Sequence, residues 1–228
     1  MNKNELARMF DHTALKADLT SGKVETLCRE AVEFKFASVC IPPYYLDLAQ
    51  SILNEENEVK LCTVIGFPLG YESTKTKVFA VNEAIAKGAD ELDVVINVAA
   101  IKNAEWDYLD AELNDLSVAC HKSGKILKII FETCYLSDEE VEKLAVLCAK
   151  NQVDYVKTST GFGTAGATVH HIGLMKKGVA GKCKIKASGG IRTWKDAEQM
   201  IKAGVHRIGA SSSIQILEEF LAVSAGPE

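Results

Sequence analysis

The chain has 228 residues, of which 47% are hydrophobic and 25% are charged, and its formal net charge is −5. This composition is typical of a soluble globular protein, and the length suits one domain better than two. The negative charge gives no reason to expect nucleic acid or an anionic membrane as a partner, so any phosphate must bind at a local site.

Three features predict a cytoplasmic protein that spans no membrane. The N-terminal residues Met1–Arg8 are polar and lead into a helix, with no sign of a targeting sequence. The apolar stretch Val94–Ile101 is interrupted by Asn97 and is too short to cross a bilayer. The seven cysteines form no Cys-x-x-Cys pair and show no ligand-like spacing with the histidines. We therefore expect reduced thiols and no metal site.

Short apolar runs alternate with longer segments of helical period along the whole chain. The expected strands are Phe10–Thr13, Ala37–Ile41, Val59–Gly66, Glu91–Val98, Ile126–Glu132, Val153–Ser159, Lys184–Ser188 and Val205–Ala210. The expected helices are Lys23–Glu33, Tyr44–Asn54, Thr74–Lys87, Trp106–Lys122, Asp138–Lys150, Val169–Lys177, Thr193–Ala203 and Ile214–Val223. Eight βα units predict a closed (β/α)₈ TIM barrel that forms a single domain over residues 1–228. A doubly wound open sheet is the alternative.

Local signals support the boundaries of these elements. Ser137 with Glu140 predicts a capping box at a helix start, and Thr193 with Asp196 predicts a similar start. The tail Ser224–Glu228 is expected to fray. No linker or low-complexity segment marks a domain boundary, which agrees with a single domain.

Charged residues lie where the interior of a barrel strand should be apolar. Because side chains alternate along a strand, Asp93, Lys128, Lys157 and Lys186 should point into the barrel. An aspartate with up to three lysines does not reach neutrality, so burial and like charge should depress the pKa of at least one lysine. A neutral lysine can form a Schiff base, and its charged neighbours could then move protons. The alternative is a structural ion-pair network.

Glycine-rich turns follow three of the later strands, and each contains hydroxyl groups or lies beside them. The turns are Gly161–Gly163, Ser188–Gly190 and Gly209–Ser212, and the last two follow the seventh and eighth strands. Barrel enzymes often bind phosphate at this position through backbone N–H groups. Ordinary βα loops are the alternative interpretation. The segment Gly161–Gly166 also matches G-x-G-x-x-G, but the acidic residue of a dinucleotide site is missing near Lys184–Lys186.

Five blocks of the sequence resemble the signature blocks of the deoxyribose-phosphate aldolase family, in the family's order and over nearly the whole chain. They are Asp11–Thr13, Glu91–Asn97, Val156–Phe162, Lys186–Arg192 and Gly209–Ser212. The resemblance implies a metal-free class I aldolase with a (β/α)₈ fold and no cofactor. Such an enzyme reversibly cleaves 2-deoxy-D-ribose 5-phosphate to D-glyceraldehyde 3-phosphate and acetaldehyde, in deoxyribose phosphate catabolism. The implied partner is a small phosphorylated sugar, and a homo-oligomer is possible.

The resemblance also implies roles for individual residues. Lys157 would form the Schiff base, and Asp93 and Lys186 would donate and accept protons. The residues implied to hold the phosphate are Gly161, Gly189, Gly190, Gly209, Ser211 and Ser212. The implied supporting residues are Asp11, Lys128, Thr158 and Ser188.

The chain departs from the common family pattern outside these three catalytic positions. Ser213 and Ala165 stand where glycine is frequent, His170–His171 replaces an acidic pair, and Ala99 and Asn103 replace glycines. Two other functions remain open. One is a Schiff-base aldolase acting on a different phosphorylated sugar, and the other is a non-catalytic phosphosugar-binding barrel.

Overall fold

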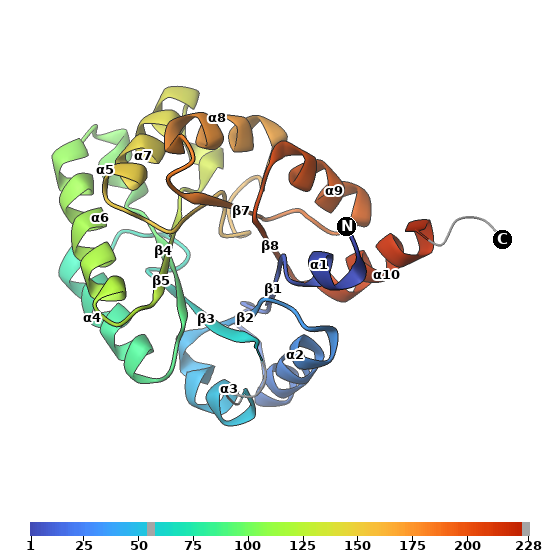
Figure 1. The fold of residues 1–228 in the computed structure, drawn as a ribbon. Coiled ribbons are helices and arrows are strands. Elements are labelled where there is room, and N and C mark those ends of the chain that lie inside the picture. Colours follow the sequence, from blue (N-terminus) through green and yellow to red (C-terminus); the bar gives the residue numbers. More distant parts are fainter. Residues whose placement is uncertain (54–57, 225–228) are drawn as a thin grey trace.

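The computed structural model describes residues 1–53 and 58–224, within which eight parallel strands close into a barrel in sequence order. Figure 1 shows the helices packed around the outside of these strands. The strands are β1 (Phe10–Thr13), β2 (Ser38–Ile41), β3 (Lys60–Ile65), β4 (Glu91–Val95), β5 (Ile126–Ile130), β6 (Tyr155–Lys157), β7 (Lys184–Ser188) and β8 (Arg207–Ala210). The pairing of β1 with β8 closes the sheet, so the barrel prediction is confirmed and the open-sheet alternative is wrong.

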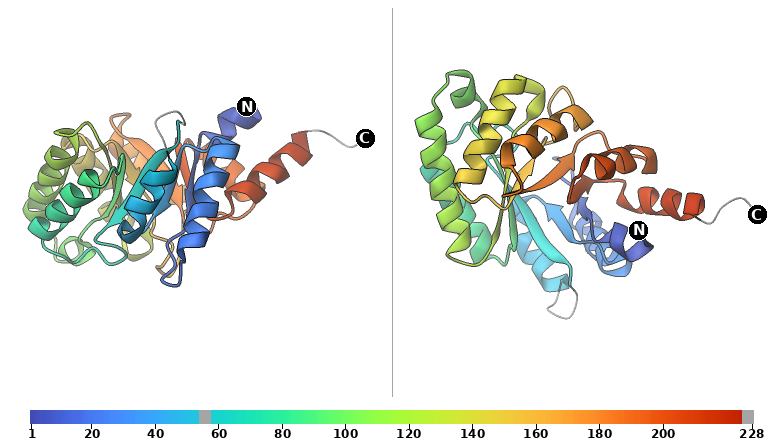
Figure 2. Two further views of the ribbon diagram at one scale, coloured as in Figure 1. Left: turned by 90° about the horizontal axis from the view of Figure 1, so that it is seen from below. Right: turned by 45° about the horizontal axis from the view of Figure 1, so that its top comes forward.

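The helices complete the βα units. The α-helices are α1 (Lys3–Ala7), α2 (Ser21–Phe34), α3 (Leu46–Ile52), α4 (Thr74–Ala86), α5 (Val98–Lys102), α6 (Trp106–His121), α7 (Asp138–Lys150), α8 (Val169–Val179), α9 (Trp194–Ala203) and α10 (Ser213–Ser224). Two 3₁₀-helices, η1 (Pro43–Tyr45) and η2 (Thr133–Tyr135), follow β2 and β5. The helix α1 contacts α10, and both views of Figure 2 show these two helices on the same side of the molecule. None of the described helices combines the length and apolarity that crossing a bilayer requires.

The strands have an apolar outer face and a polar inner face. Leu92 and Val94 of β4 are fully buried and belong to the main apolar core, which lies between the barrel and its helices. Asp93 lies between them in the chain and is buried inside the barrel. This alternation follows from the period of two in a strand, and it places the charged side chains together in the interior.

The boundaries differ from the prediction where polar caps interrupt an apolar run. The run ending at Val98 was expected to stay extended, but β4 ends at Val95 and α5 begins at Val98. The cause is Asn97, whose side chain accepts a hydrogen bond from the Ala100 N–H at 3.2 Å and so caps α5. The N-terminal residues do more than lead into a helix, because they form α1 themselves.

The two expected helix starts are confirmed. Ser137 caps α7 and Thr193 caps α9, each in a reciprocal capping box with the acidic residue three positions later. The expected helix end at Asn54 and the expected fraying after Ser224 fall on residues outside the described ranges. Ser224 itself ends α10.

The cysteines all carry free thiols, and Cys134 is partly exposed whereas the other six are buried. Cys40 of β2 and Cys62 of β3 are partners in the register of the sheet, so their thiols lie side by side inside the barrel. The chain separation of 22 positions gave no sign of this pairing, because it depends on the register between two strands.

Candidate active site

Three lysines converge on a single carboxylate inside the barrel. The Nζ atoms of Lys157 and Lys186 each lie 2.7 Å from Oδ2 of Asp93, and Nζ of Lys128 lies 2.9 Å from Oδ1. All four side chains are buried, with 3% of the Lys157 side chain exposed and none of Asp93. The structure therefore brings together the four inward residues that the strand pattern predicted.

Two further carboxylates and an arginine extend this cluster, and the sequence interpretation did not include Glu91 or Arg207. Asp11 accepts from Lys186 and from Arg207, and Glu91 lies 2.5 Å from Nζ of Lys128 and 3.4 Å from Arg207. We call the seven residues Asp11, Glu91, Asp93, Lys128, Lys157, Lys186 and Arg207 the barrel network. Glu91 could have been found from sequence, because it shares the strand face of Asp93 two positions earlier.

The additional carboxylates change the expected electrostatics. Burial alone lowers the pKa of Lys186, but the carboxylates of Asp11 and Asp93 outweigh burial and raise it. Burial also lowers the pKa of Lys128, but Asp93, Glu91 and the other negative groups around it together outweigh burial and raise it. Burial raises the pKa of Asp93, but the three lysines together hold it well below its usual range. The sequence predicts a depressed pKa for at least one lysine, and Lys128 and Lys186 are not that lysine, because the carboxylates of Asp11 and Glu91 add to that of Asp93.

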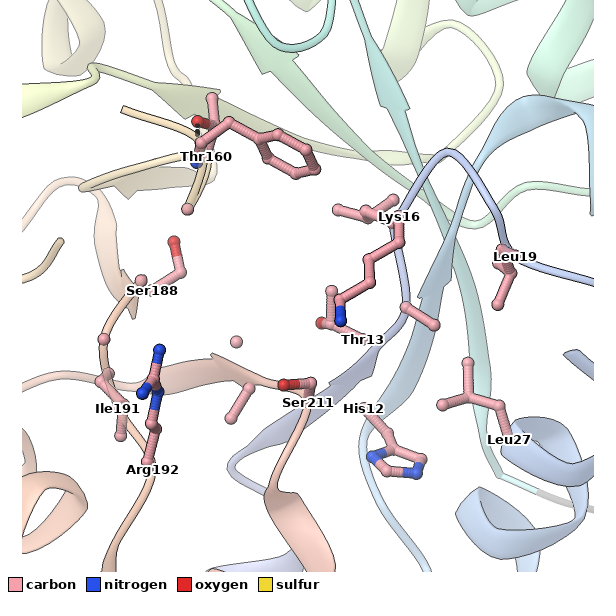
Figure 3. A pocket seen from close by; sticks show the side chains of 18 of the residues that line it. His12, Thr13, Lys16, Leu19, Leu27, Thr160, Ser188, Ile191, Arg192 and Ser211 are labelled. Carbon is pink, nitrogen blue, oxygen red and sulfur yellow. Dashed lines mark hydrogen bonds between the residues drawn. The ribbon is translucent and has the colours of Figure 1, made fainter. Parts of the chain in front are cut away.

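Lys157 is the member of the network that reaches open space. It lies at the C-terminal end of β6 and lines a cavity of about 570 Å³, whereas Lys128 and Lys186 do not line it. The opposite wall is formed by the end of β1 and the loop that follows it, from which Thr13 and Lys16 point inward (Figure 3). A buried amine with access to a small-molecule cavity is suited to react with a carbonyl carbon.

The glycine-rich turns form another wall of the same cavity. Gly161, Gly189, Gly190, Gly209 and Ser211, which the resemblance implies as phosphate-binding residues, line it, whereas Ser212 is not among the lining residues. Gly189 has φ of +84°, and a side chain there would meet the Cα of Gly166 at 3.0 Å. Only glycine allows this close approach of two loops, and it leaves backbone N–H groups free to approach an anion.

The supporting residues act on the backbone around the cavity. Thr158 donates from Oγ1 to the Ser188 carbonyl at 3.1 Å and accepts from the Ser188 N–H at 3.1 Å, which fixes the ends of β6 and β7 to each other. Ser188 itself lines the cavity. Ser213, which departs from the family pattern, is buried and donates to the Ala210 carbonyl at 3.0 Å. Its hydroxyl therefore stabilises the start of α10.

Sequence reasoning missed several other residues that line the cavity. Arg192 points into it from the loop after β7, and Lys16 enters from the loop after β1, so the two cations face the same space (Figure 3). Phe162 also lines the cavity, and its ring packs edge-on against Phe67 at a centroid distance of 5.3 Å. These residues lie in loops, where neither alternation nor helical period indicates the direction of a side chain.

Two thiols border the network from the other side. Cys40, Cys62 and Asp93 place potential ligand atoms within 4.8 Å of one another, a grouping that the cysteine spacing did not predict. Cys62 Sγ lies 3.3 Å from Asp93 Oδ1 and 3.3 Å from Lys128 Nζ. Because ammonium groups already contact both carboxylate oxygens, a metal cation here would have to displace them.

Comparisons with known proteins agree with this geometry. A family model described as DeoC/LacD family aldolase matches residues 6–222. A deoxyribose-phosphate aldolase of an Exiguobacterium species is 50% identical over 213 residues, which cover 93% of this chain and 96% of that relative. A deoxyribose-phosphate aldolase of a Thermoanaerobacter species is 49% identical over 216 residues, which cover 94% and 96%. The solved tetrameric deoxyribose phosphate aldolase from Aeropyrum pernix superposes with a TM-score of 0.90 at 30% identity, over 97% of this chain and 93% of that one.

Proposed function

We propose that this chain, which belongs to the DeoC/LacD family of aldolases, reversibly cleaves 2-deoxy-D-ribose 5-phosphate to D-glyceraldehyde 3-phosphate and acetaldehyde. The observation that carries the proposal is Lys157, a buried amine that lines the cavity and has Asp93 as its one carboxylate partner among the described residues. The identity with relatives named for this activity supports the choice of substrate.

In the first step the amine of Lys157 attacks the aldehyde carbon of the open-chain sugar and loses water to form an imine. The imine withdraws electrons while the bond between the second and third carbons breaks. The proton of the 3-hydroxyl leaves through water, and D-glyceraldehyde 3-phosphate departs. An enamine of two carbons stays bound to Lys157.

The remaining steps need proton transfer close to Lys157. Lys186 is protonated because Asp11 and Asp93 raise its pKa, and it contacts the same oxygen of Asp93 as Lys157 does, so it is a proton carrier beside the reacting amine. Asp93 lies between the two amines, at 2.7 Å from each, and this position allows it to relay a proton between them. Protonation of the enamine gives the imine of acetaldehyde, and water then releases acetaldehyde and the free lysine.

The phosphate is assigned to the loops after β6, β7 and β8. Backbone N–H groups at Gly189, Gly190 and Gly209, with the hydroxyl of Ser211, offer donors to a dianion on one side of the cavity. Gly161 lines the same wall, and Ser212 is the neighbouring candidate at the start of α10. A phosphate bound by these loops would leave the aldehyde end of the sugar beside the amine of Lys157.

A reductive trapping experiment tests the proposal. Borohydride with acetaldehyde should attach two carbons to Lys157 and abolish cleavage, as mass spectrometry of peptides would show. Lys157→Met should take up no label. Lys16→Met is the matched control, because Lys16 lines the same cavity and this variant should still be labelled at Lys157. Label at another lysine, or none in the unmodified protein, would refute the assignment.

The same assay separates the alternatives. An aldolase for another sugar would use dihydroxyacetone phosphate as donor in place of acetaldehyde, and a non-catalytic barrel would bind phosphosugar without forming an adduct. We further propose that the enzyme acts in the cytoplasm in deoxyribose phosphate catabolism and forms a homo-oligomer. The tetrameric relative supports an oligomer, which light scattering of the purified protein would test.

A further inference from the structure

Cys40 and Cys62 are two buried thiols that lie next to each other inside the barrel. They occupy the same register position in the neighbouring parallel strands β2 and β3, and neither residue is exposed. Neighbouring strands lie about 4.8 Å apart, and the Cα atoms of disulfide-bonded cysteines are usually about 4.4–6.8 Å apart. Both sulfur atoms also lie within 4.8 Å of a carboxylate oxygen of Asp93. The register therefore places the two thiols where a disulfide can form beside the candidate active site.

The surroundings of this pair differ from those of the other four buried cysteines. Those four belong to the main apolar core, and burial raises the pKa of each of their thiols. They are Cys28, Cys120, Cys148 and Cys183. Cys40 and Cys62 form a small separate cluster inside the barrel, where Sγ of Cys62 lies 3.3 Å from Nζ of Lys128. A thiol beside cations is more reactive than a thiol in an apolar core.

The two thiols of the pair are not equivalent. The hydrogen bond from Cys62 lowers the pKa of the Cys40 thiol. Lys186 and Lys157 lower it further, and together these groups outweigh burial and the charge of Asp93, which raise it. Burial raises the pKa of the Cys62 thiol well above its usual value. Cys40 is therefore suited to attack an oxidant, and Cys62 is suited to react afterwards with the oxidised sulfur.

One side chain connects the thiol pair with the substrate cavity. Leu15 and Phe67 are partly buried and pack against the cluster of Cys40, Cys62 and Val64. Leu15 also lines the cavity, so it contacts the cavity and the cluster at once. Hydrogen peroxide is little larger than water, and a movement of Leu15 is enough to admit it to the sulfur atoms.

We propose that Cys40 and Cys62 form a redox site at which a hydroperoxide joins the two sulfur atoms in a disulfide that lowers the aldolase activity. The Cys40 sulfur attacks one oxygen of hydrogen peroxide, the O–O bond breaks, and the other oxygen leaves with the thiol proton as water. Cys40 is then a sulfenic acid. The Cys62 sulfur attacks it, the S–S bond forms, and the hydroxyl group leaves with the Cys62 proton as a second water. Two thiols are oxidised, and one peroxide is reduced to two waters.

The disulfide acts on the reaction through Asp93. In the reduced protein the Cys62 thiol donates to Asp93 Oδ1 at 3.3 Å and accepts from Lys128 at 3.3 Å. A disulfide sulfur has no proton to donate, and the bond draws the two Cβ atoms to about 3.8 Å, closer than the spacing of neighbouring strands. Asp93 then loses a hydrogen bond and shifts relative to Lys157. The effect on activity rests on the proposed function, whereas formation of the disulfide does not.

The experiment treats the reduced, purified protein with a small excess of hydrogen peroxide, blocks the remaining thiols with iodoacetamide and maps the tryptic peptides by mass spectrometry without reduction. The two thiols lie in separate peptides, because trypsin cleaves after Lys60. The expected product is the peptide of Cys40 linked to the peptide of Cys62. In the same samples, kcat for cleavage of 2-deoxyribose 5-phosphate should fall by roughly 10- to 100-fold, a loss typical of a catalytic group displaced by about 1 Å. Dithiothreitol should remove the link and restore kcat.

Two variants complete the experiment. Cys40→Ser should form no link, and its kcat after peroxide should equal its own value before peroxide; if it does not fold, Cys40→Ala gives the same comparison. Cys183→Ser is the matched control, because Cys183 is a buried thiol of the main core, and it should form the link and lose activity as the unmodified protein does.

The peptide map and the activity assay can fail separately. A sulfinic acid at Cys40 without a link, or a link between other thiols, would overturn the proposal. A link that leaves kcat unchanged would overturn the effect on activity. Absence of cleavage before any oxidation would refute the proposed function, and the peptide map would still decide whether Cys40 and Cys62 form the disulfide.

Discussion

Two buried lysine–carboxylate sites in this protein have the same chemistry but different arrangements. Outside the barrel, Nζ of Lys77 in α4 lies 2.9 Å from Glu112 Oε1 and 2.9 Å from the Val95 carbonyl. The other oxygen of Glu112 accepts from Tyr108 at 3.1 Å. Each group in this pair is satisfied by its neighbours, and one cation meets one anion. Inside the barrel, three lysines share Asp93.

The difference shows what separates a structural lysine from a reactive one. Burial lowers the pKa of Lys77 and Glu112 only partly offsets it, yet Lys77 does not line the substrate cavity. It ties α4 to α6 and to the end of β4. Lys157 shares its carboxylate with two other lysines and faces the cavity, so its amine is the one that a substrate can reach. Burial of a lysine is therefore a weaker indication of catalysis than an unbalanced set of partners.

The largest effect should come from removing the reactive amine. Lys157→Met should lower kcat for cleavage by roughly 1,000-fold or more, because the other lysines that line the cavity, Lys16 and Lys23, do not contact Asp93. Lys77→Met should keep trapping at Lys157 in whatever fraction of the protein is folded. Steady-state cleavage assays, corrected by the folded fraction from circular dichroism, compare the two. Equal losses of kcat would remove the distinction between the sites.

The second effect concerns stability. Lys77→Met should lower the free energy of unfolding by about 3–5 kcal/mol, because it leaves the buried carboxylate of Glu112 without its cation. Lys77→Met combined with Glu112→Leu should recover much of this loss, since neither charge then remains buried. Urea unfolding of the single and double variants measures the coupling. Additive losses in the double variant would mean that the two side chains do not act as a pair.

The sequence predicts the charged interior wherever alternation along a strand is regular. Asp93, Lys128 and Lys186 lie inside the barrel because their apolar neighbours pack outward against helices. Glu91 follows the same rule but lies at the first position of its strand, where a charged side chain is commonly exposed. Arg207 is likewise the first residue of β8. A charged side chain at the end of a strand can be solvated or buried. Closure of the barrel determines which of the two occurs for Glu91 and Arg207.

Loop residues and contacts between distant strands were beyond prediction for a different reason. The direction of Arg192 and of Lys16 depends on turns that carry no periodic signal. The pairing of Cys40 with Cys62 depends on the register of β2 and β3, which a sequence of two short apolar runs does not specify. The glycine turns were predictable because glycine and hydroxyl residues after strands carry their own physical meaning.

A smaller effect should appear as the pH dependence of stability. Burial raises the pKa of Asp11, but Lys186 and Arg207 outweigh it and lower the pKa well below the usual value near 4. A depressed folded-state pKa adds stability that is present above pH 4 and is lost as pH falls below it. Asp11→Asn should therefore be less stable than the unmodified protein at pH 7. Its stability should also fall less steeply below pH 4, by up to about 1.4 kcal/mol per pH unit. An equal loss of unfolding free energy between pH 7 and pH 3 in Asp11→Asn and the unmodified protein would contradict the lowered pKa of Asp11.

The last prediction is that removing metal ions has almost no effect on activity. It tests whether Asp93 pairs with the lysines or binds a metal ion. Treatment with EDTA followed by gel filtration should change kcat/KM for cleavage by less than about twofold, because the electron sink is the imine on Lys157 and no step requires a Lewis acid. The grouping of Cys40, Cys62 and Asp93 makes this a real test, since these atoms could accept a cation if the ammonium groups withdrew. Elemental analysis of the treated protein is the control that the removal is complete. A large loss of activity that zinc restores would show that Asp93 binds a metal ion in place of pairing with the lysines. The contrast with the balanced Lys77–Glu112 pair would then need a different explanation.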